Sequence, residues 1–293
     1  MHRSGTSAVT RTISAMGAAL PHNLIPPMQD NSEGFFESAD IVAVHDRFLE
    51  AIGSAWNDPR PIRPEAFGTE HAAACRADLL AILRRDFPTE RLFVIKDPRI
   101  CVLMPMWRRV LAKFGARPYV VFAYRNPEEV AQSLSRRNEA GHEHGLALWL
   151  TYNLLAERDS RDLPRVVVSY DAFLDDPAAA AKLLTARLDC FDPAQVAAGV
   201  ELARSQWKSD MRNHESDGDN ATLPPWVATL YRWLCAEGAG EAPPAAELDA
   251  VYAAMATALE LYGPIIGGRL PPAHVRPPIL KRVARRMAAI TRT

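Results

Sequence analysis

Three short apolar runs, bounded by charged or polar residues, alternate with longer segments whose apolar residues recur at helical spacing. The runs cover residues 91–95, 118–124 and 165–170. Short apolar runs of this kind are typical of strands buried in a parallel sheet. Because strands that alternate with helices form βαβ units with right-handed crossovers, the sequence predicts an α/β fold with a short parallel sheet flanked by helices.

The segments around these runs predict the helices. Apolar periodicity and capping residues indicate helices over residues 8–20, 41–52, 69–86, 101–114, 127–138, 145–158, 178–188 and 193–204. Two stretches rich in proline or glycine, residues 21–34 and 53–68, predict loops, and the first is long enough to have a function.

Composition bounds the class of protein. The chain has 293 residues, 48% hydrophobic and 24% charged, which is typical of an ordinary soluble domain. A net charge of −1 provides no basic field for nucleic acid, so we expect no nucleic-acid partner. The four cysteines are widely spaced without a C-x-x-C pair, which favours reduced thiols over disulfides or a zinc site. No spanning apolar run or signal peptide is evident, so we expect a cytoplasmic protein.

We expect one domain over residues 1–265 and a separate tail over residues 266–293. The tail contains prolines followed by a basic amphipathic stretch, and no acidic residue occurs after Glu260. Such a stretch suits peripheral contact with a membrane or a partner, and the alternative is a solvated, partly disordered end.

The first residues of the chain predict an anion site. Gly5 lies among small hydroxyl residues behind Arg3, and an apolar helical segment follows. Backbone N–H groups at a helix N-terminus attract anions, and glycine lets the backbone approach a phosphate closely. The alternative is that these residues only cap a helix.

A phosphate-binding loop usually follows the central strand of a parallel sheet, and here Met1 comes just before the loop. We therefore expect that the domain has a first strand upstream of residue 1, or else that its sheet lacks the usual first strand.

Polar residues follow each predicted strand, at the edge where ligands of open parallel sheets bind. They fall in residues 96–99, 125–133 and 169–171. Asn126 and Pro127 predict a helix start, so Arg125 stands at a strand end and Ser133 two turns along the helix. Together these two side chains could hold one anion. The alternative is that Arg125 pairs with Glu128 or Glu129 while Ser133 is solvated.

These residues carry a resemblance to a known family. The opening Arg-Ser-Gly-Thr-Ser, with Arg125 and Ser133, resembles the sulfotransferases that use 3′-phosphoadenosine 5′-phosphosulfate (PAPS). Residues 169–177 resemble a Y-E-D-L-x-x-D-P segment of that family, and residues 34–37 and 96–99 resemble its bacterial members. The likeness spans about residues 1–215 and implies a three-layer, P-loop-like α/β fold.

The resemblance implies transfer of a sulfuryl group from PAPS to a hydroxyl acceptor, without a metal. Arg3 and Lys96 match the cations that stabilise the leaving oxygen and the sulfuryl oxygens; the alternative for Lys96 is a solvated lysine at a strand end. The residues expected to bind PAPS are Arg3, Ser4, Gly5, Thr6, Ser7, Arg125 and Ser133, with Lys208 and Arg212 from a later polar segment.

A general base must take the acceptor proton. Cytosolic small-molecule sulfotransferases have a histidine where this chain has Pro98, whereas glycan- and tyrosine-directed relatives use a glutamate that Glu37 matches best. The other candidates are Glu33, Asp97 and His45, and Glu37 could instead be only a helix N-terminal charge. We therefore expect the second group and a small-molecule or glycan acceptor, with a carbohydrate hydroxyl favoured.

Two other functions remain open at this point. A P-loop kinase would need a Gly-Lys-Ser/Thr ending to its loop, which residues 3–7 lack. A non-catalytic nucleotide-binding module would share the binding residues but show no transfer activity.

Overall fold

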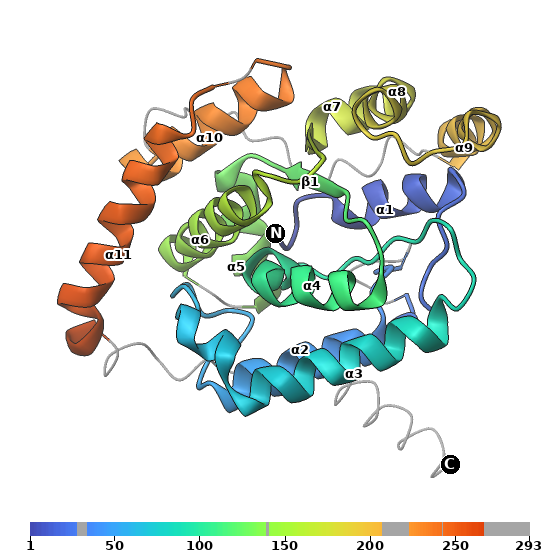
Figure 1. The fold of residues 1–293 in the computed structure, drawn as a ribbon. Helices are drawn as coiled ribbons and strands as arrows, with labels where there is room; N and C mark the ends of the chain where they lie inside the picture. The colour runs from blue at the N-terminus through green and yellow to red at the C-terminus, as the bar shows by residue number, and fades with distance from the viewer. Residues whose placement is uncertain (28–33, 139–140, 207–222, 242, 267–293) are drawn as a thin grey trace, which may run out of the picture.

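The computed structural model describes residues 1–27, 34–138, 141–206, 223–241 and 243–266. Figure 1 shows the arrangement of its elements. The elements are α1 (Thr6–Ala15), α2 (Ala39–Ala51), η1 (Pro64–Gly68), α3 (Glu70–Asp86), α4 (Ile100–Phe114), β1 (Val120–Tyr124), α5 (Pro127–Asn138), α6 (His142–Ser160), β2 (Arg165–Ser169), α7 (Tyr170–Asp175), α8 (Pro177–Arg187), α9 (Pro193–Gln206), α10 (Pro225–Gly238) and α11 (Ala246–Ile266).

Within these described residues the sheet consists of two parallel strands, β1 and β2, with Val120 opposite Arg165 and Tyr124 opposite Ser169. Successive side chains of β1 point to opposite faces, as the pleat of a strand requires. Phe122 packs into a core with α4, α6 and α10, whereas Ala123 packs into a second core with α1 and α8. Helices therefore cover both faces, and the protein is a mostly helical α/β structure with a short parallel sheet.

The prediction that residues 91–95 form a strand of this sheet was wrong. The segment is extended, but it makes a single parallel bridge between Phe93 and Ala19. Ala19 N–H donates to Leu92 O at 3.0 Å, and Val94 N–H donates to Ala19 O at 2.9 Å. It does not pair with β1.

Two predicted boundaries need correction. The first helix ends at Ala15, because Gly17 adopts a φ of 98° and turns the chain toward the Ala19 bridge. The predicted strand over residues 165–170 ends at Ser169, because Ser169 caps the short helix α7, which begins at Tyr170: Ser169 Oγ accepts from the Ala172 amide. The helices α10 and α11 lie in a part of the chain where the sequence analysis predicted no element.

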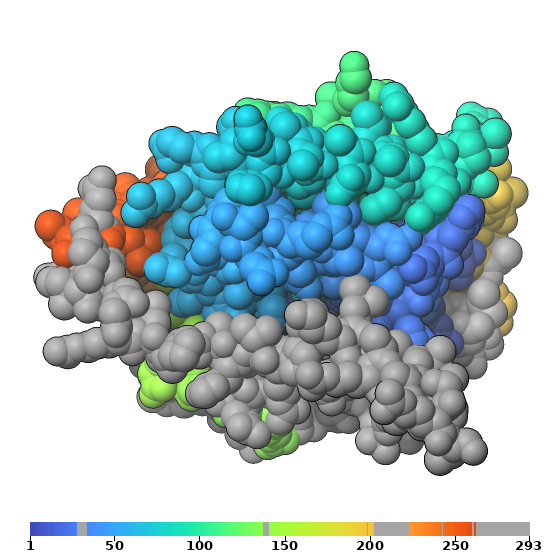
Figure 2. Space-filling model, turned by 90° about the horizontal axis from the view of Figure 1, so that it is seen from below, coloured from blue at the N-terminus to red at the C-terminus, as the bar shows by residue number. Residues whose placement is uncertain are grey.

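Helices also form much of the outside of the molecule. In Figure 2, which views the molecule from below, α2 and α3 cover much of one face. The start of the chain lies inside: Met1 is 2% exposed, and Figure 1 marks the N-terminus near the middle of the fold. Within the described residues, no helix combines the length and hydropathy needed to cross a membrane.

Candidate functional site

The loop before α1 approaches the end of β2 closely. Gly5 has a φ of 74°, and a Cβ there would lie 1.9 Å from Cδ2 of Tyr170, so only glycine fits. Ser4 is fully buried, and its Oγ has no hydrogen-bond partner among the described residues. The N-cap residue of α1 is Gly5, which has no side chain to cap the helix N-terminus. An unpartnered buried hydroxyl beside an uncapped helix N-terminus is an arrangement that suits an anionic ligand.

Arg3 joins this loop to α5. Its φ of 62° is unusual for a residue other than glycine, and its Nε donates to Ser133 Oγ at 2.8 Å. Ser133 is buried rather than solvated. The contact brings together the two anion-binding segments that the sequence predicted separately, although 130 positions separate them.

Arg125 lies at the same edge, between β1 and α5. Its Nε and Nη2 donate to Oε2 of Glu129 at 2.6 and 2.5 Å, and its guanidinium lies 4.7 Å above the ring of Tyr170. The alternative pairing considered from the sequence therefore occurs with Glu129. However, the pair is buried, so it differs from the weak surface pair considered there. The Tyr170 ring lies between Arg125 and Gly5, because the guanidinium and the glycine both contact it.

Lys96 and Glu37 form the second part of the site. Lys96 Nζ lies 2.5 Å from Glu37 Oε1, and it also donates to Phe35 O at 3.0 Å and to Ser7 Oγ at 3.3 Å. Glu37 is only 5% exposed. Lys96 is therefore not a solvated strand-end lysine, because it joins the carboxylate to the first turn of α1.

The turn that presents Glu37 is strained. Gly34 has a φ of 93° and Phe36 a φ of 55°, so the chain adopts left-handed conformations on both sides of Phe35. A bulky residue such as phenylalanine rarely adopts this region, at a cost of about 1–3 kcal/mol. Such strain is concentrated at functional sites, where surrounding contacts maintain it.

Asp97 and His45 face away from this turn, into a buried network. His45 Nδ1 lies 2.9 Å from Asp97 Oδ2, and Trp107 Nε1 donates to His45 Nε2 at 3.0 Å. Arg99 donates to Asp97 from its amide and from Nη1, both at 2.9 Å. Because Trp107 occupies Nε2, the proton of the neutral imidazole is on Nδ1 and is donated to Asp97.

These contacts remove Asp97 and His45 as bases for an acceptor. Burial by itself would raise the pKa of Asp97, but the Arg99 charge and the His45 hydrogen bond outweigh burial and hold the pKa well below its usual range. Both side chains are enclosed and fully engaged. Among the described candidates, Glu37 remains.

His2 lies beside the glycine loop, and no pattern in the sequence indicated it as a site residue. Its ring lies 4.8 Å from that of Trp56 and 5.8 Å from that of Tyr152. Burial and the nearby Arg99 charge lower the pKa of His2 well below its ordinary value, so the ring is neutral at pH 7. Its Nε2 has no hydrogen-bond partner among the described residues. A histidine beside a glycine loop is too common a pattern to have indicated this.

Some predicted residues lie outside the described residues: Glu33, Lys208, Arg212 and, of the tail predicted over residues 266–293, all but Ile266. Within the described part of the chain, no group of three or more histidine, cysteine or acidic side chains is arranged to hold a metal ion.

Comparison of the chain with protein-family models, with curated proteins and with solved structures finds no match.

Proposed function

We propose that this protein is a PAPS-dependent sulfotransferase with a P-loop-like, three-layer fold. The observation that carries the proposal is the contact between Arg3 Nε and Ser133 Oγ at 2.8 Å. It joins the loop that resembles the family's 5′-phosphosulfate segment to the helix that resembles its 3′-phosphate segment. One nucleotide carrying both groups could therefore contact both segments.

The residues present fit such a nucleotide. The 5′-phosphosulfate binds at the N-terminus of α1, where the backbone amides, Ser4 Oγ and the Thr6 hydroxyl act as donors. Ser7 Oγ donates to Phe35 O and accepts from Lys96, so it holds that cation beside the group. The 3′-phosphate binds between Arg125 and Ser133, with the Glu129 contact holding the guanidinium in place.

Transfer requires one proton acceptor and charge stabilisation on the leaving group. The acceptor oxygen attacks sulfur, the bond from sulfur to the bridging phosphate oxygen breaks, and adenosine 3′,5′-bisphosphate leaves. Glu37 accepts the hydroxyl proton. Arg3 and Lys96 stabilise the charge that develops on the sulfuryl and phosphate oxygens.

Lys96 is suited to this role because it has more than one partner. When Glu37 accepts the proton, its attraction for Lys96 weakens. The bonds from Lys96 to Phe35 O and Ser7 Oγ then keep the ammonium beside α1. Lys96 therefore stays at the phosphosulfate end of the site throughout the transfer.

The direct test is transfer of labelled sulfate from PAPS to a panel of mono- and oligosaccharides, a tyrosine peptide and a phenol. We expect sulfation of a carbohydrate hydroxyl, and a decrease in kcat of about 10²- to 10⁴-fold in Glu37→Gln and Arg3→Ala. The matched control is Arg108→Ala, which removes an exposed ion pair with Asp162 and should leave activity unchanged.

Binding experiments separate the proposal from the two other functions. Tight binding of adenosine 3′,5′-bisphosphate without magnesium supports it, whereas magnesium-dependent ATP binding favours a P-loop kinase. Binding of the bisphosphate without sulfation of any acceptor would indicate a non-catalytic module.

A second prediction concerns the 3′-phosphate. Arg125→Ala should weaken binding of adenosine 3′,5′-bisphosphate by about 100-fold, since a charge-assisted contact is lost. Binding of adenosine 5′-monophosphate should change by only a few-fold. Because Glu129 then loses a buried partner, Arg125→Ala combined with Glu129→Gln is the control. Equal weakening for both nucleotides, measured by calorimetry, would show that Arg125 does not bind the 3′-phosphate.

A further inference from the structure

A cavity of about 200 Å³ lies between β1 and the extended residues 93–96. Residues 119–123 and 93–98 line it, together with Met1 and side chains from α1, α4 and α6. Protein cores contain few voids larger than one water, and a water needs only about 10–15 Å³ of such space. The cavity is therefore far larger than an ordinary packing defect.

The two segments beside the cavity each have a backbone edge that pairs with no other strand in the described part of the chain. Val120 N–H donates to Pro164 O in the ladder with β2, so alternation directs the backbone groups of Val121 and Ala123 to the opposite edge of β1. Among the described residues, that edge pairs with no strand. Edge groups of this kind are a template for another strand.

The same alternation applies across the cavity. Leu92 O and Val94 N–H bond to Ala19, so the backbone groups of Phe93 and Ile95 point to the other edge of their segment. Val94 and Val121 remain partly exposed although helices cover both faces of the sheet. Backbone N–H and C=O groups of β1 thus border the cavity on one side, and those of residues 93–96 border it on the other.

We propose that this cavity is a strand-binding site, which takes an extended apolar peptide segment between β1 and residues 93–96. The segment completes a continuous sheet by hydrogen bonding to both edges. A compact apolar molecule could fill the volume, but it could not satisfy two rows of peptide N–H and C=O groups. The inference does not depend on the proposed activity.

The segment runs parallel to β1. The pair β1–β2 and the Ala19–Phe93 bridge are both parallel. Lys96 and Arg125 each follow their strand, so both lie at the carboxyl end of the sheet, where the candidate site is. Met1 lines the cavity, and Arg3 contacts Ser133 at that same end of the sheet. The carboxyl end of the bound segment therefore lies beside Met1.

The lining also specifies the side chains of the segment. Val9 and Ile13 of α1 cover one face of the cavity, and Met104 of α4 and Ala156 of α6 belong to the core on the other face. A strand with apolar neighbours on both faces needs apolar residues at every position, with β-branched side chains preferred.

The test tethers a segment to the full chain at Met1, where a short linker gives a high effective concentration. One form carries a six-residue extension rich in valine and isoleucine, and the other a glycine-serine extension of equal length. We expect the apolar extension to raise the Tm and to slow amide exchange at Phe93, Ile95, Val121 and Ala123 by roughly tenfold or more relative to the other form.

A second variant isolates the edge of β1. Val121→Pro removes an N–H that faces the cavity and leaves the Val120–Pro164 bond intact, so the chain should still fold. In this background the apolar extension should stabilise the protein less. Equal Tm values for the two extensions would overturn the proposal, as would stabilisation without slowed exchange at those amides, since the extension would then pack elsewhere.

Discussion

Lys96 and Asp97 are adjacent in the chain and have opposite surroundings. Lys96 faces Glu37 and the first turn of α1, whereas Asp97 faces His45 and Arg99 in the interior. Adjacent side chains of an extended segment point to opposite sides, so the Asp97 network anchors the backbone from which Lys96 projects. A residue that looked like a candidate base thus positions the cation of the site.

The buried pairing of Asp97 predicts a pH dependence of stability. Because its pKa is lowered in the folded state, the contribution of Asp97 is fully present above its unfolded value of about 3.9. That contribution decreases as the pH falls below this value toward the lowered folded one. Asp97→Asn should cost about 3–5 kcal/mol at pH 7, since it leaves a buried arginine with one partner fewer, and should flatten this dependence.

Urea unfolding at pH 7, 4 and 3 measures both effects. Asp78→Asn is the control, because the Arg47–Asp78 pair is more than half exposed on both sides. It should change stability by less than about 1 kcal/mol. If Asp97→Asn lost stability with pH as steeply as the unsubstituted protein, the acid sensitivity would come from other carboxyl groups.

Close contacts between helices position the segments of the site. At Gly145 in α6, a Cβ would lie 2.8 Å from Cα of Ala131 in α5, the helix that carries Ser133. At Gly199 in α9, a Cβ would lie 2.7 Å from the carbonyl oxygen of Ala15 in α1. These glycines allow backbones to approach closely, and through α5 and α1 they set the distance between the loop before α1 and Ser133.

Gly145→Ala should therefore destabilise the fold by about 1–3 kcal/mol, since the methyl group overpacks a contact with backbone. Gly68→Ala is the matched control, because nothing lies within 4 Å of its Cβ position; it should change stability by at most about 0.5 kcal/mol. Chemical denaturation measures both. If the two substitutions changed the free energy of unfolding equally, α5 and α6 would be able to move apart without loss of stability.

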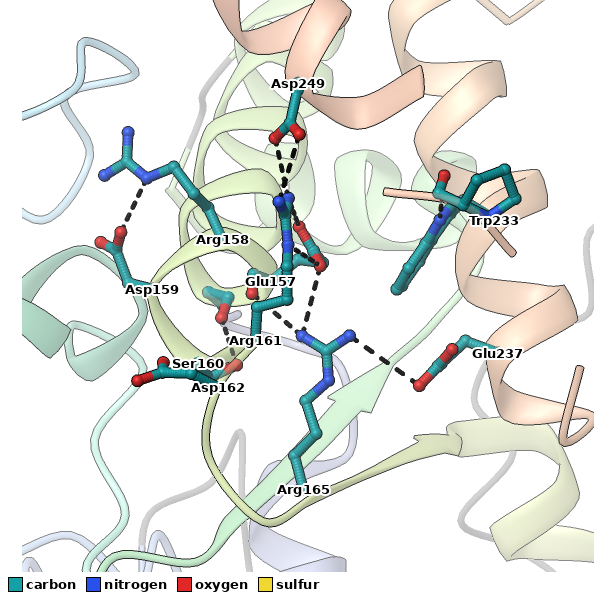
Figure 3. Close-up of polar contacts among 12 residues, drawn as sticks. Glu157, Arg158, Asp159, Ser160, Arg161, Asp162, Arg165, Trp233, Glu237 and Asp249 are labelled. Atoms are coloured by element: carbon teal, nitrogen blue, oxygen red, sulfur yellow. Dashed lines mark hydrogen bonds and ion pairs between the residues drawn. The ribbon is translucent and has the colours of Figure 1, made fainter. Parts of the chain in front are cut away.

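An ionic network centred on the buried Glu157 connects distant parts of the whole molecule. Glu157 of α6 is fully buried and accepts from Arg161 Nε and Nη2 at 3.0 and 2.7 Å and from Arg165 Nη1 at 3.3 Å. Arg161 also bonds Asp249 of α11, and Arg165 lies 3.8 Å from Glu237 of α10. Figure 3 shows Glu157 of α6, Arg165 of β2, Glu237 of α10 and Asp249 of α11 converging on this network. The network attaches α10 and α11 to the sheet, away from the candidate site.

Glu157→Gln should therefore cost about 3–5 kcal/mol of global stability, because two arginines lose a buried carboxylate. Asp162→Asn, which weakens the exposed pair with Arg108, is the comparison and should cost less than about 1 kcal/mol. Unfolding should remain a single transition. A separate early transition of α10 and α11 would show that the network holds only these helices.

The sequence determined the elements that local patterns specify. The alternation of apolar runs and helical segments predicted β1, β2 and most helices, because periodicity depends on residues close in the chain. Arg125 and Ser133 were also predicted to lie together, since polar residues after parallel strands gather at one end of the sheet. Only the resemblance to sulfotransferases linked the glycine loop to them. Glu37 and Lys96 were each predicted, but no local pattern indicated that they form a pair.

Only the tertiary structure decided which candidates face the site and which face the core. It buries Asp97 and His45 together, pairs Arg125 with Glu129, brings His2 against Trp56, and leaves residues 91–95 unpaired with β1. These outcomes depend on contacts between residues far apart in the chain. The free energy of burying or pairing a charge depends on all its neighbours in space, so composition and spacing do not determine it.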